Sequence, residues 1–364
     1  MFRVMHIEHP DGGRSLVTLA DIAQAAGVSI ATVSKVLRGI DVGTSAATRA
    51  RIQATAEQLG YRRNLLVEGM QTGRSLTIGV VIPPYGEFTR RLADAIHGRC
   101  LTHGLIPIFH WAPPTIRRSD PAEAEAEDAA DERAVLDRLL DRRVDGVLLY
   151  PAADGALTSQ VHVCQAQGIP VVAMDRCPEP GVVDFIGTDD AAGARLAAEH
   201  LLARGHRRIL IMGGEARYAS YRTRTAVVAA TVQAAGGHCT IAEVPNADLD
   251  NLMPHARRLL AEDPAATAIA LGTDVFAPAV YRAAQEAGRA IPGALAVVGF
   301  AGLGLGSCLR PTLTTVAQDP ESLGSLATDR LQERLRSAVT GSRPWSILLQ
   351  PHLEVRNSTG GGPS

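Results

Sequence analysis

The sequence predicts a two-part fold of the α plus α/β class, in which a helix-turn-helix head precedes a two-lobed α/β body. Two short helical patterns meet at Gly27 within Val17–Leu37. From Leu76 onward, short apolar strands alternate with amphipathic helices, and a loop at Cys177–Gly181 separates two such series. Alternation of this kind is typical of parallel sheets covered by helices on both faces, and two series indicate two lobes.

The first helix of the head is predicted from its cap, its apolar spacing and its stop signal. Thr18 can cap this helix, with Asp21 three residues on as its capping-box partner. Apolar side chains recur at helical spacing and predict the buried face: Leu19, Ile22, Ala23 and Ala26. Gly27 then stands where a tight turn requires a positive φ, which a β-carbon disfavours.

The second helix has the pattern of a helix that reads DNA. Ser29 can cap it. The side chains expected to point inward are Val33, Val36 and Leu37. The side chains left on the outer face are Ile30, Ala31, Ser34 and Lys35. A third helix fits Ser45–Leu59, with Gly60 as a left-handed stop. The alternative interpretation of this region is an ordinary small helical bundle.

The body is predicted as two successive α/β series. In the first series we expect strands at Thr77–Pro83, Ile106–His110, Val144–Tyr150 and Ile169–Asp175, and helices at Phe88–His103, Ala129–Arg142 and Leu157–Gln167. In the second series we expect strands at Arg208–Met212, Cys239–Ala242, Ala268–Leu271 and Ala296–Phe300, and helices at Ala191–Arg204, Arg224–Ala235, Leu252–Ala261 and Ala277–Ala287. Trp111–Asp128 is expected to form a surface loop that leads into an acidic helix start. A ligand would bind between the lobes, at the carboxyl ends of the strands.

Composition and charge exclude several classes of protein. Residues 1–75 hold nine Lys and Arg and six Asp and Glu, which gives this segment a charge of +3. Because the net charge of the whole chain is −2, residues 76–364 carry −5. A basic head suits contact with phosphates. The five cysteines are scattered and the eleven histidines form no cluster, so we expect neither a metal site nor a cofactor. With no apolar run of transmembrane length and no secretory signal, we expect no membrane partner and a cytoplasmic location.

The order of these parts resembles the LacI/GalR family of bacterial transcription regulators. The most specific motif is T-L-A-D-I-A-Q-A-A-G-V-S, which continues through T-V-S-K-V-L and later E-Q-L-G-Y at Glu57–Tyr61. Weaker matches follow in the family's order, among them I-G-V-V-I-P at Ile78–Pro83 and P-T-L-T-T-V at Pro311–Val316. The resemblance implies a nucleoid-associated homodimer in which each head places its second helix in the major groove of one half of a palindromic operator.

The resemblance also implies which residues contact DNA. Ile30 and Ala31 would read base edges at the start of the second helix, with Lys35 one turn further on. Three hydroxyl side chains would hold phosphates: Ser29, Thr32 and Ser34. Helix capping and local backbone bonding remain the alternative role for these hydroxyls.

The linker matches the family's hinge, which enters the minor groove and wedges an apolar side chain between base pairs. Asn64 matches the hinge asparagine and Met70 falls at the wedge position. This chain departs from the family at three hinge positions, which are Arg63 in place of the usual proline, Val67 in place of a small residue, and Gly69. We therefore expect a hinge that is disordered without DNA and orders less readily than is usual.

The resemblance implies an effector site for a small molecule, such as a sugar or a sugar derivative. Asp175, Arg222 and Asp274 match ligand-contacting positions, although Asp274 follows Thr273 where the family has asparagine. Phe88 and Phe276 would line the cleft. For the aspartates the alternative is a strand-end or helix-cap role, and for the aromatic side chains it is the core. The family's G-F-D-D is G-F-A-G here, at residues 299–302, so carboxylates that often bind sugar hydroxyls are missing.

Together these observations predict a ligand-controlled DNA-binding regulator, most simply a repressor. The expected organisation is a disordered tail at 1–14, the head at 15–62, the hinge at 63–75, the effector-binding and dimerisation domain at 76–357 and a flexible tail at 358–364. An alternative is a small-molecule binding protein of the periplasmic type. The helix-turn-helix head attached to the body makes this alternative less favoured. An enzyme is disfavoured, because the G-L-G-L-G run at Gly302–Gly306 lacks the spacing and setting of a nucleotide loop and no other catalytic motif is present.

Overall fold

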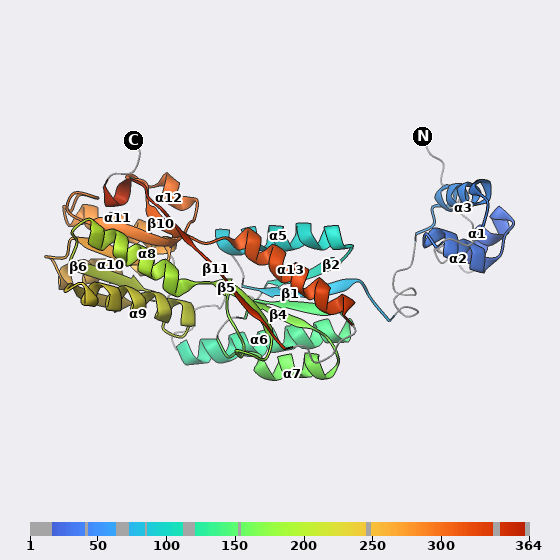
Figure 1. Cartoon of the computed structure of the whole chain (residues 1–364), viewed down its shortest axis with the longest axis horizontal. Coiled ribbons are helices and arrows are strands. Elements are labelled where there is room, and N and C mark those ends of the chain that lie inside the picture. Colours follow the sequence, from blue (N-terminus) through green and yellow to red (C-terminus); the bar gives the residue numbers. More distant parts are fainter. Residues whose placement is uncertain are drawn as a thin grey trace. The chain divides into compact units, whose positions relative to one another are not determined.

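The computed structural model describes residues 17–40, 43–62, 73–83, 86–111, 121–151, 154–244, 249–337 and 343–360. The chain divides into two compact units, residues 1–75 and residues 76–364. Figure 1 shows the elements of both units in sequence colours. Most of the expected hinge, including Asn64 and Met70, lies outside the described residues.

The head consists of the helices α1 (Leu19–Ala26), α2 (Ile30–Leu37) and α3 (Ala46–Gln58). The expected capping box is present, because the Thr18 hydroxyl accepts from the Asp21 amide while the Asp21 carboxylate accepts from the Thr18 amide at 2.7 Å. Gly27 ends α1 with φ at +65°, as a left-handed turn requires. The apolar faces of the three helices meet in one small core, formed by Ile22, Ala23, Ala26, Val33, Val36, Ile52 and Ala56.

The first lobe contains a parallel six-stranded sheet in the order β11-β5-β4-β3-β1-β2. Its strands are β1 (Thr77–Ile82), β2 (Ile106–Trp111), β3 (Gly146–Leu149), β4 (Val171–Met174), β5 (Asp184–Thr188) and β11 (Ser346–Leu349). Its helices are α5 (Glu87–His103), α6 (Pro121–Asp141), α7 (Thr158–Ala166) and α13 (Pro320–Arg336). Because side chains alternate along a strand, one face of the sheet packs against α5 and α13 and the other against α6 and α7 (Figure 1).

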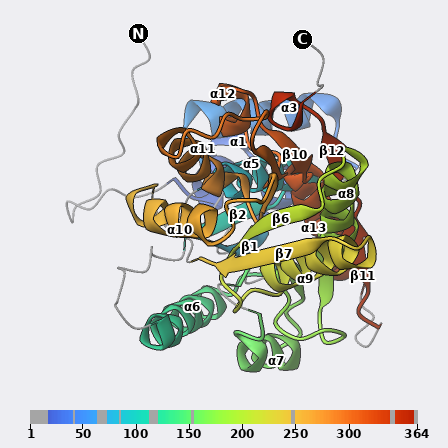
Figure 2. The ribbon, with the colours of Figure 1, turned by 90° about the vertical axis from the view of Figure 1, so that its left-hand side faces the viewer.

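The second lobe contains a six-stranded sheet in the order β12-β10-β9-β8-β6-β7, in which only β12 is antiparallel. Its strands are β6 (Arg208–Gly213), β7 (His238–Glu243), β8 (Ala268–Leu271), β9 (Ala296–Ala301), β10 (Thr314–Ala317) and β12 (His352–Glu354). The helices α8 (Asp190–Ala203) and α9 (Ala219–Ala234) cover one face. The helices α10 (Leu249–Glu262) and α11 (Ala277–Glu286) cover the other, as Figure 2 shows.

The chain passes between the lobes three times, where the sequence pattern indicated one passage at Cys177–Gly181. The first crossover follows β5, which still belongs to the first lobe, and the second precedes α13, which returns to it. The third joins β11 in the first lobe to β12 in the second. The two expected series named no element after Phe300 and therefore omitted α13 and β11, which complete the first lobe together with β5.

Two further expectations are corrected by the structure. Residues 121–128 belong to the helix α6, which begins at Pro121 rather than at the expected Ala129. Ser358 and Thr359, assigned to a flexible tail, are buried in the second lobe. The Ser358 hydroxyl donates to the Val297 carbonyl at 2.6 Å and accepts from the Thr314 amide at 2.8 Å. Two neutral hydrogen bonds in a buried setting hold the end of the chain against β9 and β10.

Candidate functional site

The outer face of α2 presents the side chains expected to read DNA. Ile30 is 52% exposed despite being apolar, and Ala31 and Lys35 are also exposed. Val33 and Val36 face the core of the head, so the helix is oriented by burial of its other side. An exposed isoleucine and an exposed lysine on the same helix suit contact with a thymine methyl and with guanine acceptors in a major groove.

The hydroxyl side chains of α2 make local contacts in the structure. The Ser29 hydroxyl accepts from the Thr32 amide at 3.1 Å and is paired with the Thr32 hydroxyl at 2.8 Å. The Ser34 carbonyl accepts from the Arg38 side chain at 3.3 Å, and the Ser34 side chain is partly buried. Ser29 therefore acts as the helix cap, which is the alternative role considered for these hydroxyls.

Asp175 lies at the carboxyl end of β4 in a strained backbone conformation, with φ at +59°. Its carboxylate accepts a short hydrogen bond, 2.5 Å, from the Tyr150 hydroxyl. Burial raises the pKa of Tyr150 well above its ordinary value, with the Asp175 charge acting in the same direction. Tyr150 therefore stays a donor at neutral pH. Strain of this kind in a non-glycine residue is typical of functional positions.

The Arg176 guanidinium joins the two lobes through aromatic rings. Its central carbon lies 5.0 Å from the centre of the Tyr150 ring in the first lobe and 3.9 Å from the Tyr218 ring in the second. Arg176 also donates to the Pro151 carbonyl at 3.1 Å. A cation in contact with the faces of two rings gains favourable electrostatic energy from both.

Arg224, rather than Arg222, projects into the buried part of this region. The Arg224 guanidinium donates to the Asp190 carboxylate at 2.7 Å and to the Gly272 carbonyl at 2.9 Å. It also lies 3.8 Å from the centre of the Phe300 ring. Burial raises the pKa of Asp190, against the opposing effect of the Arg224 charge. A small cavity next to this arginine is lined by residues of α8, α9 and the second sheet.

Arg222 lies on the exposed side of α9 and donates to the Ala216 carbonyl. Residues two positions apart in a helix differ by about 200° in their direction around its axis, so Arg222 and Arg224 point to nearly opposite sides. The buried face of α9 runs through Val228 and Val232, and counting back by four reaches Arg224. The helical spacing of the apolar residues could therefore have distinguished the two arginines.

The remaining expected site residues have structural contacts. Asp274 is fully buried, and its carboxylate accepts from the Thr315 hydroxyl at 2.7 Å and the Leu303 amide at 2.8 Å. Burial raises the pKa of Asp274 to about 6. Phe276 is also fully buried, in the core of the second lobe, and Phe88 packs against the core of the first. The structure therefore brings Asp175 near Tyr150 and Arg176, but not near Phe276.

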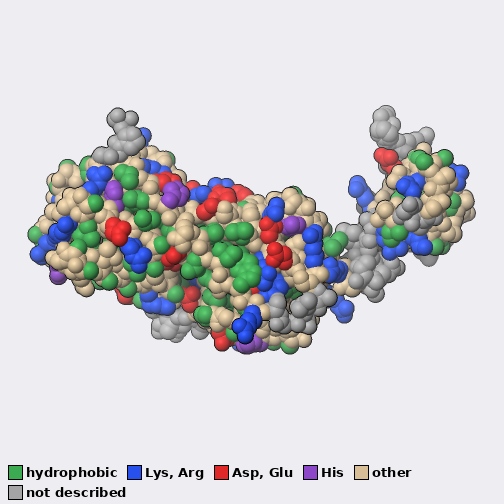
Figure 3. Space-filling view, in the orientation of Figure 1, with side chains coloured by type: hydrophobic (Ala, Val, Ile, Leu, Met, Phe, Trp, Pro, Cys, Tyr) green, Lys and Arg blue, Asp and Glu red, His purple; other side chains and the backbone are tan. Residues whose placement is uncertain are grey.

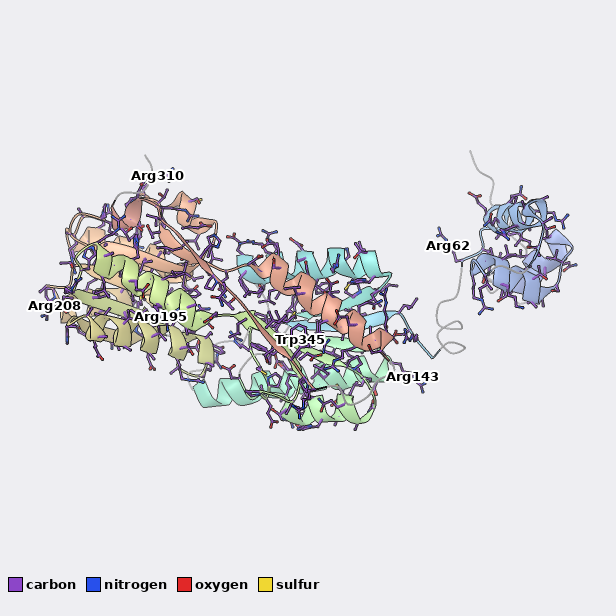
Figure 4. The ribbon with its side chains drawn as sticks, in the orientation of Figure 1. Arg62, Arg143, Arg195, Arg208, Arg310 and Trp345 are labelled. Atoms are coloured by element: carbon purple, nitrogen blue, oxygen red, sulfur yellow. The ribbon has the colours of Figure 1, made fainter. Side chains whose placement is uncertain are left out.

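Several charged side chains elsewhere on the body form ion pairs. Figure 3 shows acidic and basic side chains next to one another over α5 and α13. Arg208, labelled in Figure 4, lies at the end of the second lobe remote from the first and binds Asp263 at 2.6 Å. Within the described residues, no group of three or more His, Cys, Asp or Glu side chains could hold a metal ion. No described helix is long and apolar enough to span a membrane.

The helix-turn-helix head and the two-lobed body define a DNA-binding regulator with a small-molecule binding domain. Residues 18–64 match bacterial regulatory proteins of the lacI family, and residues 198–359 match the periplasmic binding protein-like domain. The ribose operon repressor of Halalkalibacterium halodurans is 30% identical over 359 residues, which cover 95% of this chain and 98% of that protein. The chain belongs to the LacI family, which consists of transcription regulators rather than enzymes.

Other relatives agree with this assignment. Catabolite control protein A of Priestia megaterium is 27% identical over 353 residues, which cover 94% of this chain and 99% of that protein. The structure of a lac repressor dimer bound to operator and the anti-inducer ONPF is 26% identical, covers 95% of this chain and 100% of that chain, and has a TM-score of 0.82. The similarity therefore extends over the head and both lobes.

Proposed function

We propose that this protein is a repressor that binds a palindromic operator as a homodimer and is switched by a small molecule bound between its lobes. The observation that carries the proposal is the outer face of α2, where Ile30, Ala31 and Lys35 are exposed together. A related repressor is named for a ribose operon, and a related structure is a dimer on operator DNA. As a reader of genomic DNA it would act in the cytoplasm, in association with the nucleoid.

We propose that Ile30, Ala31 and Lys35 contact base edges, while Ser29, Thr32 and Ser34 lie against phosphates. Asn64 and Met70 would enter the minor groove, as in the hinge of the family. The Ser29 hydroxyl already serves as a cap, so a phosphate contact there would use its remaining hydrogen-bonding capacity.

We propose that the effector binds between the lobes beside Asp175, Tyr150 and Arg176, with Arg224 and Asp190 forming the deeper polar pair. These side chains offer acceptors and fixed cationic donors, which suit the hydroxyl groups of a sugar or sugar derivative. Arg222 and Asp274 would act less directly, because one is exposed on the far side of α9 and the other holds a loop. Phe88 and Phe276 would shape the cleft from within the cores.

Selection of binding sites from random DNA with the full-length protein tests the regulatory function. We expect recovery of a palindrome, with affinity that falls steeply as salt rises, because bound phosphates release counterions. Recovery of no common sequence would refute the proposal.

Lys35→Ala then tests the reading face. We expect a loss of about 1–3 kcal/mol that is confined to one base pair in each half-site. Arg195→Ala removes a cation from α8 in the body and serves as the matched control (Figure 4). An equal loss at every base position would instead assign Lys35 to a phosphate.

A further inference from the structure

A carboxylate of the first lobe binds a backbone amide of the second. Glu87 is the first residue of α5, and Gly304 lies in the glycine-rich loop after β9. The Gly304 amide donates to both carboxylate oxygens of Glu87, at 2.9 and 2.8 Å. The two residues are 217 positions apart, and no covalent crossover passes through either of them. A hydrogen bond to an ionised acceptor is about twice as strong as a neutral one.

The space above Gly304 explains why this position holds glycine. A β-carbon added there would lie 3.2 Å from each carboxylate oxygen of Glu87, which is tighter than ordinary contact. The backbone of Gly304 is right-handed helical, with φ at −58° and ψ at −27°, so its conformation does not require glycine. The close approach of Glu87 accounts for the glycine at position 304. The G-L-G-L-G run, which does not fit a nucleotide loop, thus contains a residue that contacts the other lobe.

The loop that carries Gly304 is also held from the side of the second lobe. The buried Asp274 carboxylate accepts from the Leu303 amide, the residue immediately before Gly304. Consecutive amides of one loop thus donate to two carboxylates, one from each lobe. The loop is fixed from both sides, so that a displacement of the lobes must break the outer contact first, since the inner one lies within a single lobe.

A second carboxylate makes the same kind of contact elsewhere between the lobes. Asp154 follows β3 in the first lobe and accepts from the amide of Ala219, the first residue of α9. This is one of the amides that a helix leaves without an internal partner, and the helix dipole favours an acidic acceptor there. Two acid-to-amide contacts therefore join the lobes after different strands of each sheet.

The Glu87 contact lies at one end of a rigid element. The helix α5 extends for 17 residues, or about 25 Å, from Glu87 to His103. Beyond its far end the Ile106 amide donates to the Leu76 carbonyl, where the chain enters the body from the hinge. Side-chain pairs fasten α5 to α13: Arg91 with Glu321, Arg99 with Asp329, and His103 with Asp329. A change at Glu87 is thus connected mechanically to the hinge side of the lobe.

We propose that Glu87 and Asp154 form a latch that holds the two lobes in the arrangement seen here. The lobes then interconvert between an arrangement in which the two contacts are formed and one in which they are broken, and the latch stabilises the first. The strength of the latch therefore sets how much effector is needed to shift this equilibrium. The proposal refines the proposed function by adding a regulatory element outside the ligand-binding side chains. The latch is tested without effector and without DNA. A negative result would therefore refute the latch and leave the proposed function as a repressor unaffected.

Hydrogen–deuterium exchange of the full chain without ligand tests the latch. In Glu87→Ala we expect the segment that contains Gly304 to exchange at least fivefold faster than in the unaltered protein. We also expect faster exchange at Ala219, because opening of the lobes breaks the second contact as well. The control is Asp94→Ala, which removes a carboxylate from the exposed side of the same helix, where it is paired with Arg90. This control should leave both segments unchanged.

A second variant approaches the same contact from the other lobe. Gly304→Ala places a methyl group against the Glu87 carboxylate without straining the backbone, and it should reproduce the exchange pattern of Glu87→Ala. The double variant should exchange no faster than either single variant, since both remove one contact. Acceleration confined to the Gly304 segment, with Ala219 still protected, would overturn the latch, as would wild-type exchange in both single variants.

Discussion

Removal of the Asp184 carboxylate is expected to destabilise the first lobe strongly. Asp184, at the start of β5, is almost fully buried and accepts from two guanidinium groups of α13. Arg330 donates at 3.0 and 3.3 Å, and Arg334 donates at 2.6 and 2.8 Å. The Trp345 amide donates to the same carboxylate at 3.0 Å. One side chain thereby fastens α13 and the segment before β11 to the rest of the lobe.

The size of the effect follows from the groups that Asp184→Ala leaves behind. Two mostly buried guanidinium groups and one backbone amide would lose their acceptor, and breaking a buried ion pair from one side costs about 3–5 kcal/mol. For a unit of this size each kcal/mol lowers the melting temperature by roughly 2–4 °C, so we expect a decrease of about 6–20 °C. Urea unfolding followed by circular dichroism measures the same loss as a lower midpoint.

The control for Asp184 uses the same arginine. Glu333 also accepts from Arg330, at 2.9 Å, but its side chain is 64% exposed. Exposed ion pairs contribute about 0–1 kcal/mol, so Glu333→Ala should leave the midpoint nearly unchanged. A loss below about 1 kcal/mol in Asp184→Ala, or equal losses in the two variants, would refute the reasoning.

Acid provides an independent check on Asp184. Burial alone would raise the pKa of Asp184, but hydrogen bonds from Arg334 and Arg330 hold it below its ordinary value. A carboxylate with a lowered folded-state pKa contributes stability above its unfolded pKa of about 3.9 and loses it as the pH falls through the folded value. The stability of the unaltered protein should therefore fall below about pH 4, and this component should be absent in Asp184→Ala.

Three further predictions concern other buried or cleft residues. Burial raises the pKa of Asp274 to about 6, so its ionisation opposes folding, and its contribution to stability should fall by about 3 kcal/mol between pH 4 and pH 7. Asp274→Asn should flatten that decline in urea titrations at several pH values, and an unchanged slope would contradict the assignment. Ser358→Ala should cost about 1–3 kcal/mol in thermal unfolding, because it leaves the buried Thr314 amide without its acceptor; a neutral change would mean that the C-terminal residues are not held. Arg224→Gln should abolish the response of operator binding to effector, whereas Arg222→Gln should retain it, as measured by fluorescence anisotropy, and the reverse order would restore Arg222 as the ligand contact.

The head was predictable in detail because each of its signals is local. The Thr18 cap, the turn at Gly27 and the Ser29 cap each bond to groups no more than four residues away. Eight strands of the body were also predicted from their apolar runs, as is typical of parallel strands, whereas β5, β10, β11 and β12 were not expected. Local signals of this kind do not depend on which part of the chain lies alongside.

The errors share a different cause, which is distance along the chain. The helix α13 has an ordinary amphipathic sequence, and nothing local indicates that it crosses back to cover the first lobe. Likewise Ser358 stands in a Gly- and Ser-rich segment, yet its hydroxyl meets β9 and β10 from more than forty residues away. The role of Arg222 stays a prediction, but the positions of Val228 and Val232 already indicated that Arg224 lies on the buried face of α9.

In each lobe a non-glycine residue with a positive φ stands at the carboxyl end of a strand. Asp175 follows β4 with φ at +59°, and Ala301 ends β9 with φ at +115°. Each such residue costs of the order of 1–3 kcal/mol and persists only where its surroundings hold it. Asp175 directly precedes Arg176, whose guanidinium lies between two rings from different lobes. Ala301 directly precedes the loop whose Gly304 amide donates to Glu87. Leu76, Arg143 and Leu157 also have a positive φ, so such strain is not confined to the contacts between the lobes. At Asp175 and Ala301 it stands directly before residues that make those contacts.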